Sequence, residues 1–168
     1  MDNIYLCGFM GCGKSSAGKI LAQKLGYDFE DTDTLIEKKL GQSIPDIFAE
    51  KGEDYFRDIE HEMCKQASLF DKTVVAMGGG ALCFERNAAA LKNSGRIIFI
   101  DVPLEIIVNR LKGDKSRPLF SEDNFERLEC LYTSRHPIYK KNSHITVDGT
   151  GDTHEAVNKI LLIKDECK

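Results

Sequence analysis

Short runs of apolar residues alternate along this chain with longer segments in which apolar residues recur at helical spacing. Runs typical of strands buried on both faces of a parallel sheet occur at residues 4–7, 73–77 and 97–100. Residues 17–25 instead place apolar side chains every three or four positions, which is typical of a helix that covers a sheet. The alternation of the two patterns predicts an α/β fold with helices on both faces of a parallel sheet.

Turn-forming residues mark the expected ends of these elements. Gly26 and Gly41 follow helical segments and favour a stop at each, because glycine adopts the left-handed backbone conformation without strain. Ser43 followed by Pro45 is typical of a helix start, and that helix is expected to end at residues 51–52. Further strands are expected at residues 27–30 and 144–147, and further helices at residues 56–70, 84–94, 103–111 and 125–141, with a last helix capped by Thr153.

Composition and charge narrow the classes of protein to consider. The 168 residues suffice for one domain with a substantial core, so we expect a single domain over residues 1–168. A net charge of −4 argues against a general binder of nucleic acid or anionic membranes. No apolar run approaches the ~20 residues that span a bilayer, and a strand expected at residue 4 leaves no room for a signal peptide. Six cysteines without a CxxC pair are typical of reduced thiols, and we expect a cytoplasmic monomer.

The strongest chemical signal is GFMGCGKS at residues 8–15, directly after the first apolar run. It fits the phosphate-binding P-loop, in which backbone N–H groups and a helix N-terminus surround phosphate oxygens. In such a loop Lys14 would reach the β- and γ-phosphates, and the Ser15 hydroxyl would bind Mg²⁺. A glycine-rich turn that binds nothing would explain the glycines but not the adjacent Lys-Ser pair, so nucleotide binding is favoured.

Two further segments follow expected strands and are therefore expected at the same edge of the sheet. Asp31 and Asp33 would share a face if extended, and would diverge if Asp33 starts a helix. One could then serve Mg²⁺ through water while the other meets a substrate hydroxyl. The alternative is a helix-capping acid with a solvated neighbour. Three glycines at residues 78–80 cost conformational order, and close approach of a ligand to the backbone explains them better than packing does.

Several arginines are candidates for binding anions. Arg57 in the segment FRDIE can be braced by Glu60 three residues on, although an ordinary surface ion pair has the same pattern. Residues 112–124 are polar and irregular, and we expect a lid there that carries Arg117. Arg135 in the segment RHPIY is a second candidate anion clamp. For each arginine taken alone, a solvated surface position is the favoured interpretation.

Taken together, these segments resemble the shikimate kinase family, small P-loop kinases of the nucleoside-monophosphate-kinase type. The matching pieces are GFMGCGKS, DTD, FRDIE, GGG, RPL and RHPIY, in the order of the family. The resemblance implies a three-layer sandwich with a five-stranded parallel sheet, flanked by helices, and a lid over ATP. It also implies transfer of the γ-phosphoryl group of ATP to the 3-hydroxyl of shikimate, in chorismate and aromatic amino-acid biosynthesis.

The resemblance assigns roles to individual residues. It implies that Asp33 takes the acceptor hydroxyl, that Asp31 holds Mg²⁺ through water with Ser15 as a further ligand, and that Lys14 and Arg117 act on the transferring phosphoryl group. The residues that it implies for ATP are Gly11, Cys12, Gly13, Lys14, Ser15, Ser16, Arg110 and Arg117. Those that it implies for shikimate are Asp33, Arg57, Gly78, Gly79, Gly80 and Arg135, with the substrate-binding helices at about residues 32–62. The arginines would pair with the substrate carboxylate, which guanidinium groups match well.

Some alternatives stay open at this point. Cys12 stands where the family more often has Ser or Ala, and is either a reactive thiol or a small side chain that fills space. Kinases of gluconate or of nucleoside monophosphates share the P-loop but do not combine it with the other segments. A GTPase is disfavoured because no NKxD segment is present. A catalytically silent binding domain would be expected to have lost Lys14, Asp33 or Arg57, and all three remain.

Overall fold

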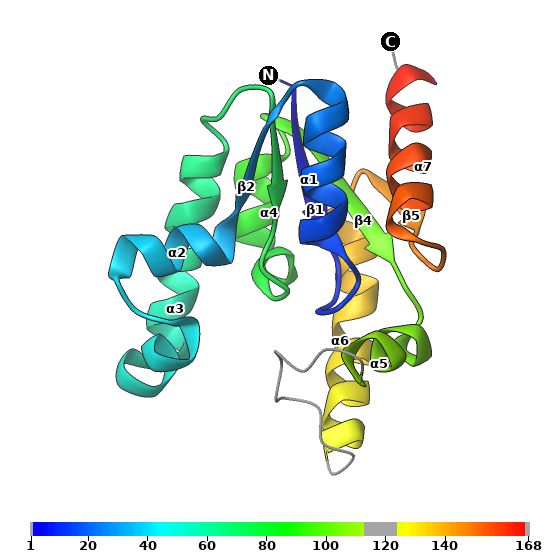
Figure 1. Cartoon of the computed structure of the whole chain (residues 1–168). Helices are drawn as coiled ribbons and strands as arrows, with labels where there is room; N and C mark the ends of the chain where they lie inside the picture. Colours follow the sequence, from blue (N-terminus) through cyan, green and yellow to red (C-terminus); the bar gives the residue numbers. More distant parts are fainter. Residues whose placement is uncertain (1, 113–123, 167–168) are drawn as a thin grey trace.

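A parallel sheet of five strands lies at the centre of the molecule, in the order β2-β3-β1-β4-β5 (Figure 1). The computed structural model describes residues 2–112 and 124–166. The strands are β1 (Asn3–Cys7), β2 (Asp28–Asp31), β3 (Thr73–Ala76), β4 (Gly95–Asp101) and β5 (Ile145–Asp148). All four strand pairs are parallel, so the predicted sheet type is confirmed.

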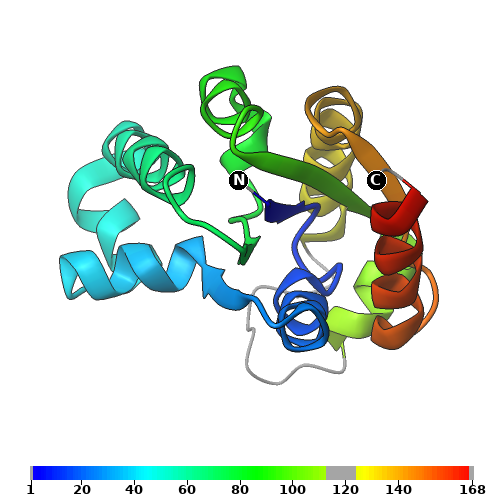
Figure 2. The same cartoon turned by 90° about the horizontal axis from the view of Figure 1, so that it is seen from above.

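Helices cover both faces of this sheet, which gives the expected three layers. The helices are α1 (Lys14–Leu25), α2 (Thr32–Leu40), α3 (Ile44–Ala67), α4 (Glu85–Leu91), α5 (Leu104–Lys112), α6 (Phe125–Asn142) and α7 (Thr153–Glu166), with a 3₁₀ turn η1 (Ala81–Cys83). Seen from above, α1 and α7 lie together on one face, and α3, α4 and α6 lie on the other (Figure 2). The apolar runs of β1, β3 and β4 are buried between these layers, because side chains of a central strand face both of them.

The register of the strands brings three loops to one edge of the sheet. The central strand β1 pairs with β3 on one side and with β4 on the other, with Leu6 opposite Ala76 and Ile98. Strand β2 pairs with the far side of β3, and its last residue, Asp31, also lies opposite Ala76. The chain therefore leaves β1, β2 and β3 at the same level, where parallel α/β sheets bind their ligands.

Most predicted boundaries are confirmed. Gly26 and Gly41 end α1 and α2 in the left-handed conformation, with φ of 66° and 65°. The Ser43 hydroxyl caps α3 by accepting a hydrogen bond from the Asp46 N–H. At Gly52 the φ of 83° interrupts this helix, at the position where two separate helices were expected.

Some boundaries differ from the expectation, and the helix expected to reach residue 70 ends at Ala67. The last helix is capped by Asp152, whose Oδ1 accepts from the Glu155 N–H at 2.8 Å, so the assignment of the cap to Thr153 is wrong by one residue. The helix expected at residues 84–94 is only α4, and η1 precedes it. The predicted lid around residues 112–124 and its Arg117 lie almost wholly outside the described residues, and the lid stays a prediction.

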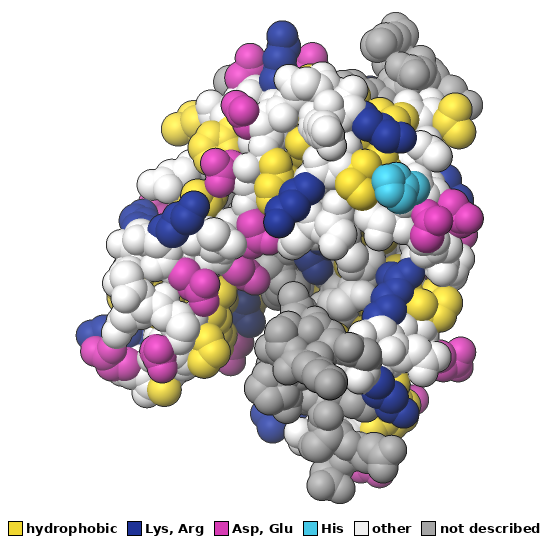
Figure 3. Space-filling view, viewed as in Figure 1, with side chains coloured by type: hydrophobic (Ala, Val, Ile, Leu, Met, Phe, Trp, Pro, Cys, Tyr) yellow, Lys and Arg dark blue, Asp and Glu magenta, His cyan; other side chains and the backbone are white. Residues whose placement is uncertain are grey.

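The surface fits the charge pattern of the sequence. The face in Figure 3 shows acidic and basic side chains interspersed, with hydrophobic side chains scattered between them. Among the described residues, no helix has the length and apolar character that crossing a membrane requires.

Candidate active site

The P-loop takes its shape from glycine backbone. Gly8, Gly11 and Gly13 have φ of 147°, 77° and 95°, a region that other residues adopt only with strain. A Cβ atom on Gly8 would lie 2.8 Å from the Ile100 carbonyl oxygen, so a side chain is also excluded by contact. Gly13 stands at the N-terminus of α1, and no side chain caps the helix there. The helix therefore directs uncapped N–H groups and partial positive charge to the loop, as an anion site requires.

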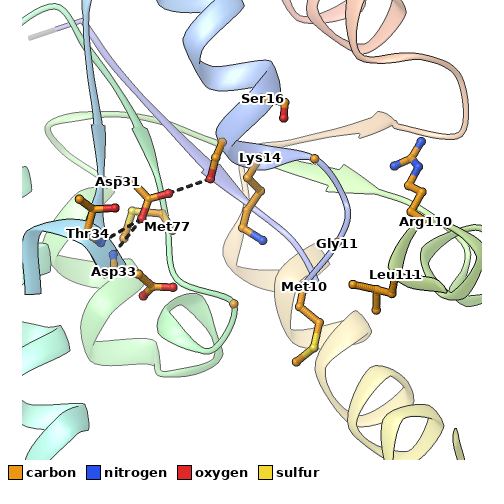
Figure 4. A pocket seen from close by; sticks show the side chains of 13 residues that line it. Met10, Gly11, Lys14, Ser16, Asp31, Asp33, Thr34, Met77, Arg110 and Leu111 are labelled. Atoms are coloured by element: carbon orange, nitrogen blue, oxygen red, sulfur yellow. Dashed lines mark hydrogen bonds between the residues drawn. The ribbon is translucent and has the colours of Figure 1, made fainter. Parts of the chain in front are cut away.

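A cleft of about 420 Å³ opens in front of this loop. Figure 4 shows Lys14 in its centre, Asp31 and Asp33 on one side, and Arg110 and Leu111 on the other. The cleft is lined by Met10, Gly11, Gly13, Lys14, Ser15, Ser16, Asp31, Asp33, Thr34, Met77, Gly79, Arg110 and Leu111. Without a nucleotide, the Lys14 ammonium group donates to the carbonyls of Gly8 and Phe9, at 2.8 and 3.1 Å. The structure thus brings together most of the residues that the sequence assigned to ATP.

Asp31 caps a helix, as one alternative for the acidic pair predicted, and it also contacts the P-loop. It is the last residue of β2, and its Oδ1 caps α2 by accepting from the N–H groups of Asp33 and Thr34, at 3.0 and 3.3 Å. Its Oδ2 accepts from the Ser15 hydroxyl at 2.7 Å. The carboxylate that caps α2 is therefore also hydrogen-bonded to the P-loop serine. The Ser15 hydroxyl and the Asp31 carboxylate are oxygen ligands of the kind that Mg²⁺ prefers.

Asp33 follows two residues later, in the first turn of α2. A Cβ on Gly78 would fall 2.5 Å from Asp33 Oδ1, so the aspartate reaches the triple-glycine loop because this position has no side chain. Between the two acids, Thr32 is buried and its hydroxyl accepts from the Gly78 N–H at 2.8 Å. Because the helix has begun at Thr32, the two acids diverge, which was one of the two alternatives, and Asp33 faces the loop that follows β3.

Arg57 is not an ordinary surface residue. Its side chain is only 12% exposed, and its Nη1 donates to the nearly buried Glu60 carboxylate at 3.0 Å. A second carboxylate, Glu53, is 64% exposed and lies 3.2 Å from Nη2. The guanidinium also contacts three aromatic rings at 5.1–5.9 Å, those of Phe48, Phe56 and Phe84. A buried, braced guanidinium of this kind is prepared to bind a further anion in a fixed orientation.

Arg135 on α6 acts on the same buried carboxylate as Arg57 on α3. Burial raises the pKa of Glu60, and the positive charges of Arg57 and Arg135 both oppose that rise. The negative charge of Asp33 contributes to raising the same pKa. These four groups, from α2, α3 and α6, are therefore close enough to influence one another electrostatically. The expected convergence of the two arginines on one site is supported by this mutual influence.

The triple-glycine loop is built differently from the P-loop. Gly78, Gly79 and Gly80 all have negative or extended φ, so backbone conformation does not require glycine there. A Cβ on Gly80 would lie 2.5 Å from Arg57 Nη1, just as one on Gly78 would meet Asp33. At Gly79, which lines the cleft, the nearest atom to an added Cβ is the Met10 nitrogen at 3.8 Å. Two of the glycines make room for functional side chains, and Gly79 leaves the backbone open to the cleft.

Arg110 connects the P-loop to the loop after β5. Its guanidinium donates to the carbonyls of Gly149 and Gly151 at 2.9 and 3.0 Å, and to that of Cys12 at 3.3 Å. Contact of Arg110 with adenine stays a prediction. Cys12 is 3% exposed, with its sulfur 3.8 Å from Lys14 Nζ. Such burial favours the space-filling interpretation of this cysteine over the reactive one.

Comparisons with known proteins agree with this geometry. A family model described as shikimate kinase matches residues 10–164. The chain belongs to the shikimate kinase family. A shikimate kinase from Persephonella marina is 44% identical to it, over 96% of this chain and 98% of the relative. Another, from Clostridium botulinum, is 43% identical and covers 96% of each chain. The family resemblance predicted from the motifs is confirmed.

Solved structures of shikimate kinases share the fold. The enzyme from Acinetobacter baumannii, in complex with shikimate, has a TM-score of 0.91 at 36% identity, covering 100% of this chain and 95% of that one. The enzyme from Aquifex aeolicus has a TM-score of 0.84 at 39% identity, covering 95% and 94%. A gluconokinase from Sinorhizobium meliloti is only 15% identical at a TM-score of 0.57, which shows a shared fold alone. The P-loop kinase fold of shikimate kinases is confirmed.

Proposed function

We propose that this chain transfers the γ-phosphoryl group of ATP to the 3-hydroxyl of shikimate at the cleft between the P-loop and the triple-glycine loop. Membership of the shikimate kinase family supports the reaction and the use of ATP. The observation that carries the site assignment is the approach of Asp33 and Arg57 to two glycines of the same loop, Gly78 and Gly80. The loop therefore has next to it an acid that could bind the substrate hydroxyl, Asp33, and a cation that could bind the substrate carboxylate, Arg57. All these groups come from one chain, so the proposal needs no partner subunit.

The substrate carboxylate would bind to Arg57 and Arg135. Guanidinium groups form paired hydrogen bonds to a planar carboxylate. In the described structure the exposed Glu53 carboxylate forms an ion pair with Nη2 of Arg57, and the buried Glu60 carboxylate forms one with Nη1. We infer that the substrate replaces Glu53 and leaves Glu60 in place, because an exposed ion pair contributes little free energy and is easily exchanged.

Asp33 would accept a hydrogen bond from the attacking hydroxyl and take its proton as the bond to phosphorus forms. Its place at the start of α2 fixes it between the glycine loop and the P-loop side of the cleft. Lys14, in the centre of the cleft, would leave the carbonyls of Gly8 and Phe9 and bind the β- and γ-phosphate oxygens. A role of Arg117 in the same charge stabilisation stays a prediction.

The residues present fit a magnesium ion next to the phosphates. The Ser15 hydroxyl and the Asp31 carboxylate are hard oxygen groups already 2.7 Å apart. Within residues 2–112 and 124–166, no group of three or more His, Cys, Asp or Glu side chains is suited to a metal ion. The other ligands would therefore be phosphate oxygens and water. When bound, Mg²⁺ would neutralise charge that develops on the β- and γ-phosphates.

A coupled assay of ADP release tests the proposal. Purified protein with Mg-ATP is given shikimate, quinate, gluconate or a nucleoside monophosphate in parallel. The proposal predicts the highest kcat/KM with shikimate, and loss of activity with EDTA that added Mg²⁺ restores. A higher kcat/KM with gluconate or a nucleoside monophosphate would contradict it. A monomeric state and a cytoplasmic location stay predictions, and gel filtration tests the first of them.

A further inference from the structure

The loop that follows β3 is fixed by buried side chains from other elements. The Gly78 N–H donates to the Thr32 hydroxyl at 2.8 Å, and the Gly79 carbonyl accepts from the Tyr139 hydroxyl. Two carbonyls further along each accept from an asparagine amide at 2.8 Å, Ala81 from Asn87 and Leu82 from Asn142. The four side chains are at most 3% exposed and come from α2, α4 and α6. A segment rich in glycine, which is intrinsically pliant, is thus held in one conformation.

Tyr139 makes the contact that bears on the cleft. Gly79 is the loop residue that lines the cleft, and its carbonyl points to α6 and away from it. Because a trans peptide unit is planar, its C=O and the following N–H point in opposite directions. Holding the Gly79 carbonyl on Tyr139 therefore directs the Gly80 N–H to the side opposite α6. Arg57 packs against the same residue, since a Cβ on Gly80 would lie 2.5 Å from its Nη1.

The same tyrosine also ties Arg135 to the loop. Arg135 and Tyr139 are four residues apart on α6 and so share a helix face. Pro137 stands between them and removes one backbone hydrogen bond from the helix. Burial raises the pKa of Tyr139 above its ordinary value, and the nearby Arg135 charge opposes that rise without reversing it. The hydroxyl is therefore protonated over the whole working pH range, and remains a hydrogen-bond donor.

We propose that Tyr139 is a positioning residue for shikimate: its hydroxyl fixes the Gly79–Gly80 peptide and the Arg135 turn of α6 relative to each other, so that both meet the substrate in one geometry. The inference rests on the proposed function. Tyr139 does not touch substrate, and its effect passes through the glycine peptide and Arg135. Its loss affects the shikimate half of the cleft and not the P-loop half.

Tyr139→Phe tests this, because it removes one oxygen atom and keeps the ring that packs against Phe99 at 5.4 Å. We expect the KM and the calorimetric Kd for shikimate to rise about five- to ten-fold, the loss that one hydrogen bond represents. The KM for ATP stays within two-fold of the wild type. This split separates positioning from a general loss of stability.

Two matched variants on the same helix serve as controls. Tyr132→Phe removes a hydroxyl that donates to the Val102 carbonyl at 3.0 Å, away from the glycine loop, and should leave both KM values within two-fold. Asn142→Ala removes the buried amide bonded to Leu82, and should lower the melting temperature at least as much as Tyr139→Phe does, with a smaller rise in the KM for shikimate.

The outcomes separate the two proposals. Unchanged shikimate KM and Kd in Tyr139→Phe, or an equal rise in the KM for ATP, would overturn the positioning role while the wild type still phosphorylates shikimate. A wild type that does not phosphorylate shikimate would overturn the proposed function, and with it this inference.

Discussion

Two glycine-rich loops line the cleft, and they use glycine for different physical reasons. In the P-loop, Gly11 and Gly13 have positive φ, and an added Cβ on Gly13 would meet nothing within 4 Å. The backbone conformation itself requires glycine there. In the loop after β3, Gly78 and Gly80 need no unusual φ, but a Cβ on either would overlap Asp33 or Arg57. One loop is shaped by its own backbone, the other by the side chains around it.

This difference determines how each half of the cleft should respond to mutation. The P-loop binds phosphate through backbone N–H groups, in a conformation that its own glycines allow. The glycine loop depends on helices α2, α3, α4 and α6, so changes far apart in the sequence should all affect shikimate. Variants of the second group should therefore alter shikimate kinetics and leave ATP binding intact.

The largest effect is expected from Asp33→Asn, which keeps the shape of the side chain but removes the base. A positioned base contributes about 10²–10⁴-fold in rate, so kcat should fall by that factor in the steady-state assay. Asp33 lies against Gly78 and is not part of the P-loop backbone that would bind the phosphates. The Kd for ATP should therefore hardly change. A kcat close to that of the wild type would remove Asp33 from this role.

Arg57→Lys should have the next largest effect. Lysine keeps the charge but cannot form paired hydrogen bonds to the substrate and also reach Glu60. A hydrogen bond to a charged group contributes about 1.5–3 kcal/mol, so the KM for shikimate should rise about ten- to hundred-fold. Titration of shikimate measures this, with the KM for ATP as the internal control. If the KM for shikimate and the KM for ATP rise together, Arg57 affects both halves of the cleft and its assignment to shikimate alone is wrong.

Paired glycine variants address the comparison itself. Gly80→Ala is compatible with the local φ of −97°, but its methyl group displaces the Arg57 guanidinium, so the KM for shikimate should rise about ten-fold. Gly13→Ala meets no atom but strains a φ of 95°, at about 1–2 kcal/mol. Its effect should appear in the Kd for ATP and in the melting temperature. If Gly80→Ala instead weakened ATP binding and Gly13→Ala raised the KM for shikimate, the distinction between the loops would be refuted.

The smallest effect is expected from Glu53→Gln. This variant removes the exposed carboxylate that pairs with Arg57 at 3.2 Å, and an exposed pair contributes at most about 1 kcal/mol. The KM for shikimate should fall, by no more than about five-fold, because the substrate no longer competes with Glu53. Glu50→Gln, at a neighbouring exposed ion pair with Lys51, is the matched control and should leave the KM unchanged. A rise in KM for Glu53→Gln would show that Glu53 supports binding.

The alternation of apolar runs and helical segments was enough to predict the sheet, its parallel strands and most helix boundaries. Strands β1, β3 and β4 are buried on both faces and therefore carry a signal that depends on few distant contacts. The cap of α7 was misplaced by one residue because Asp152 and Thr153 are both good capping residues. The two residues are distinguished only by which side chain accepts a hydrogen bond from the first N–H groups of the helix. The Asp152 carboxylate accepts from the Glu155 N–H.

The chemistry of the cleft was predictable where it lies in a local motif and much less where it depends on long-range packing. The P-loop and the acidic pair could be located from their spacing alone. The burial of Arg57 could not, since it depends on Phe84, which comes from a distant part of the chain, as well as on Phe48 in the same helix α3. Thr32 gave no signal of its own, although it lies between the two acids and fixes Gly78. Its only clue was that alternate residues of an extended segment face opposite sides.

A crystal structure with ADP and shikimate tests the central claim most directly, because it locates both substrates in the two halves of the cleft. The account predicts the shikimate carboxylate between Arg57 and Arg135, a ring hydroxyl within hydrogen-bonding distance of Asp33, and the β-phosphate of ADP in the backbone of residues 8–15. Glu60 should still hold Arg57 in that complex, while Glu53 has moved away. Shikimate bound with its carboxylate away from both arginines, or with no hydroxyl near Asp33, would contradict the account.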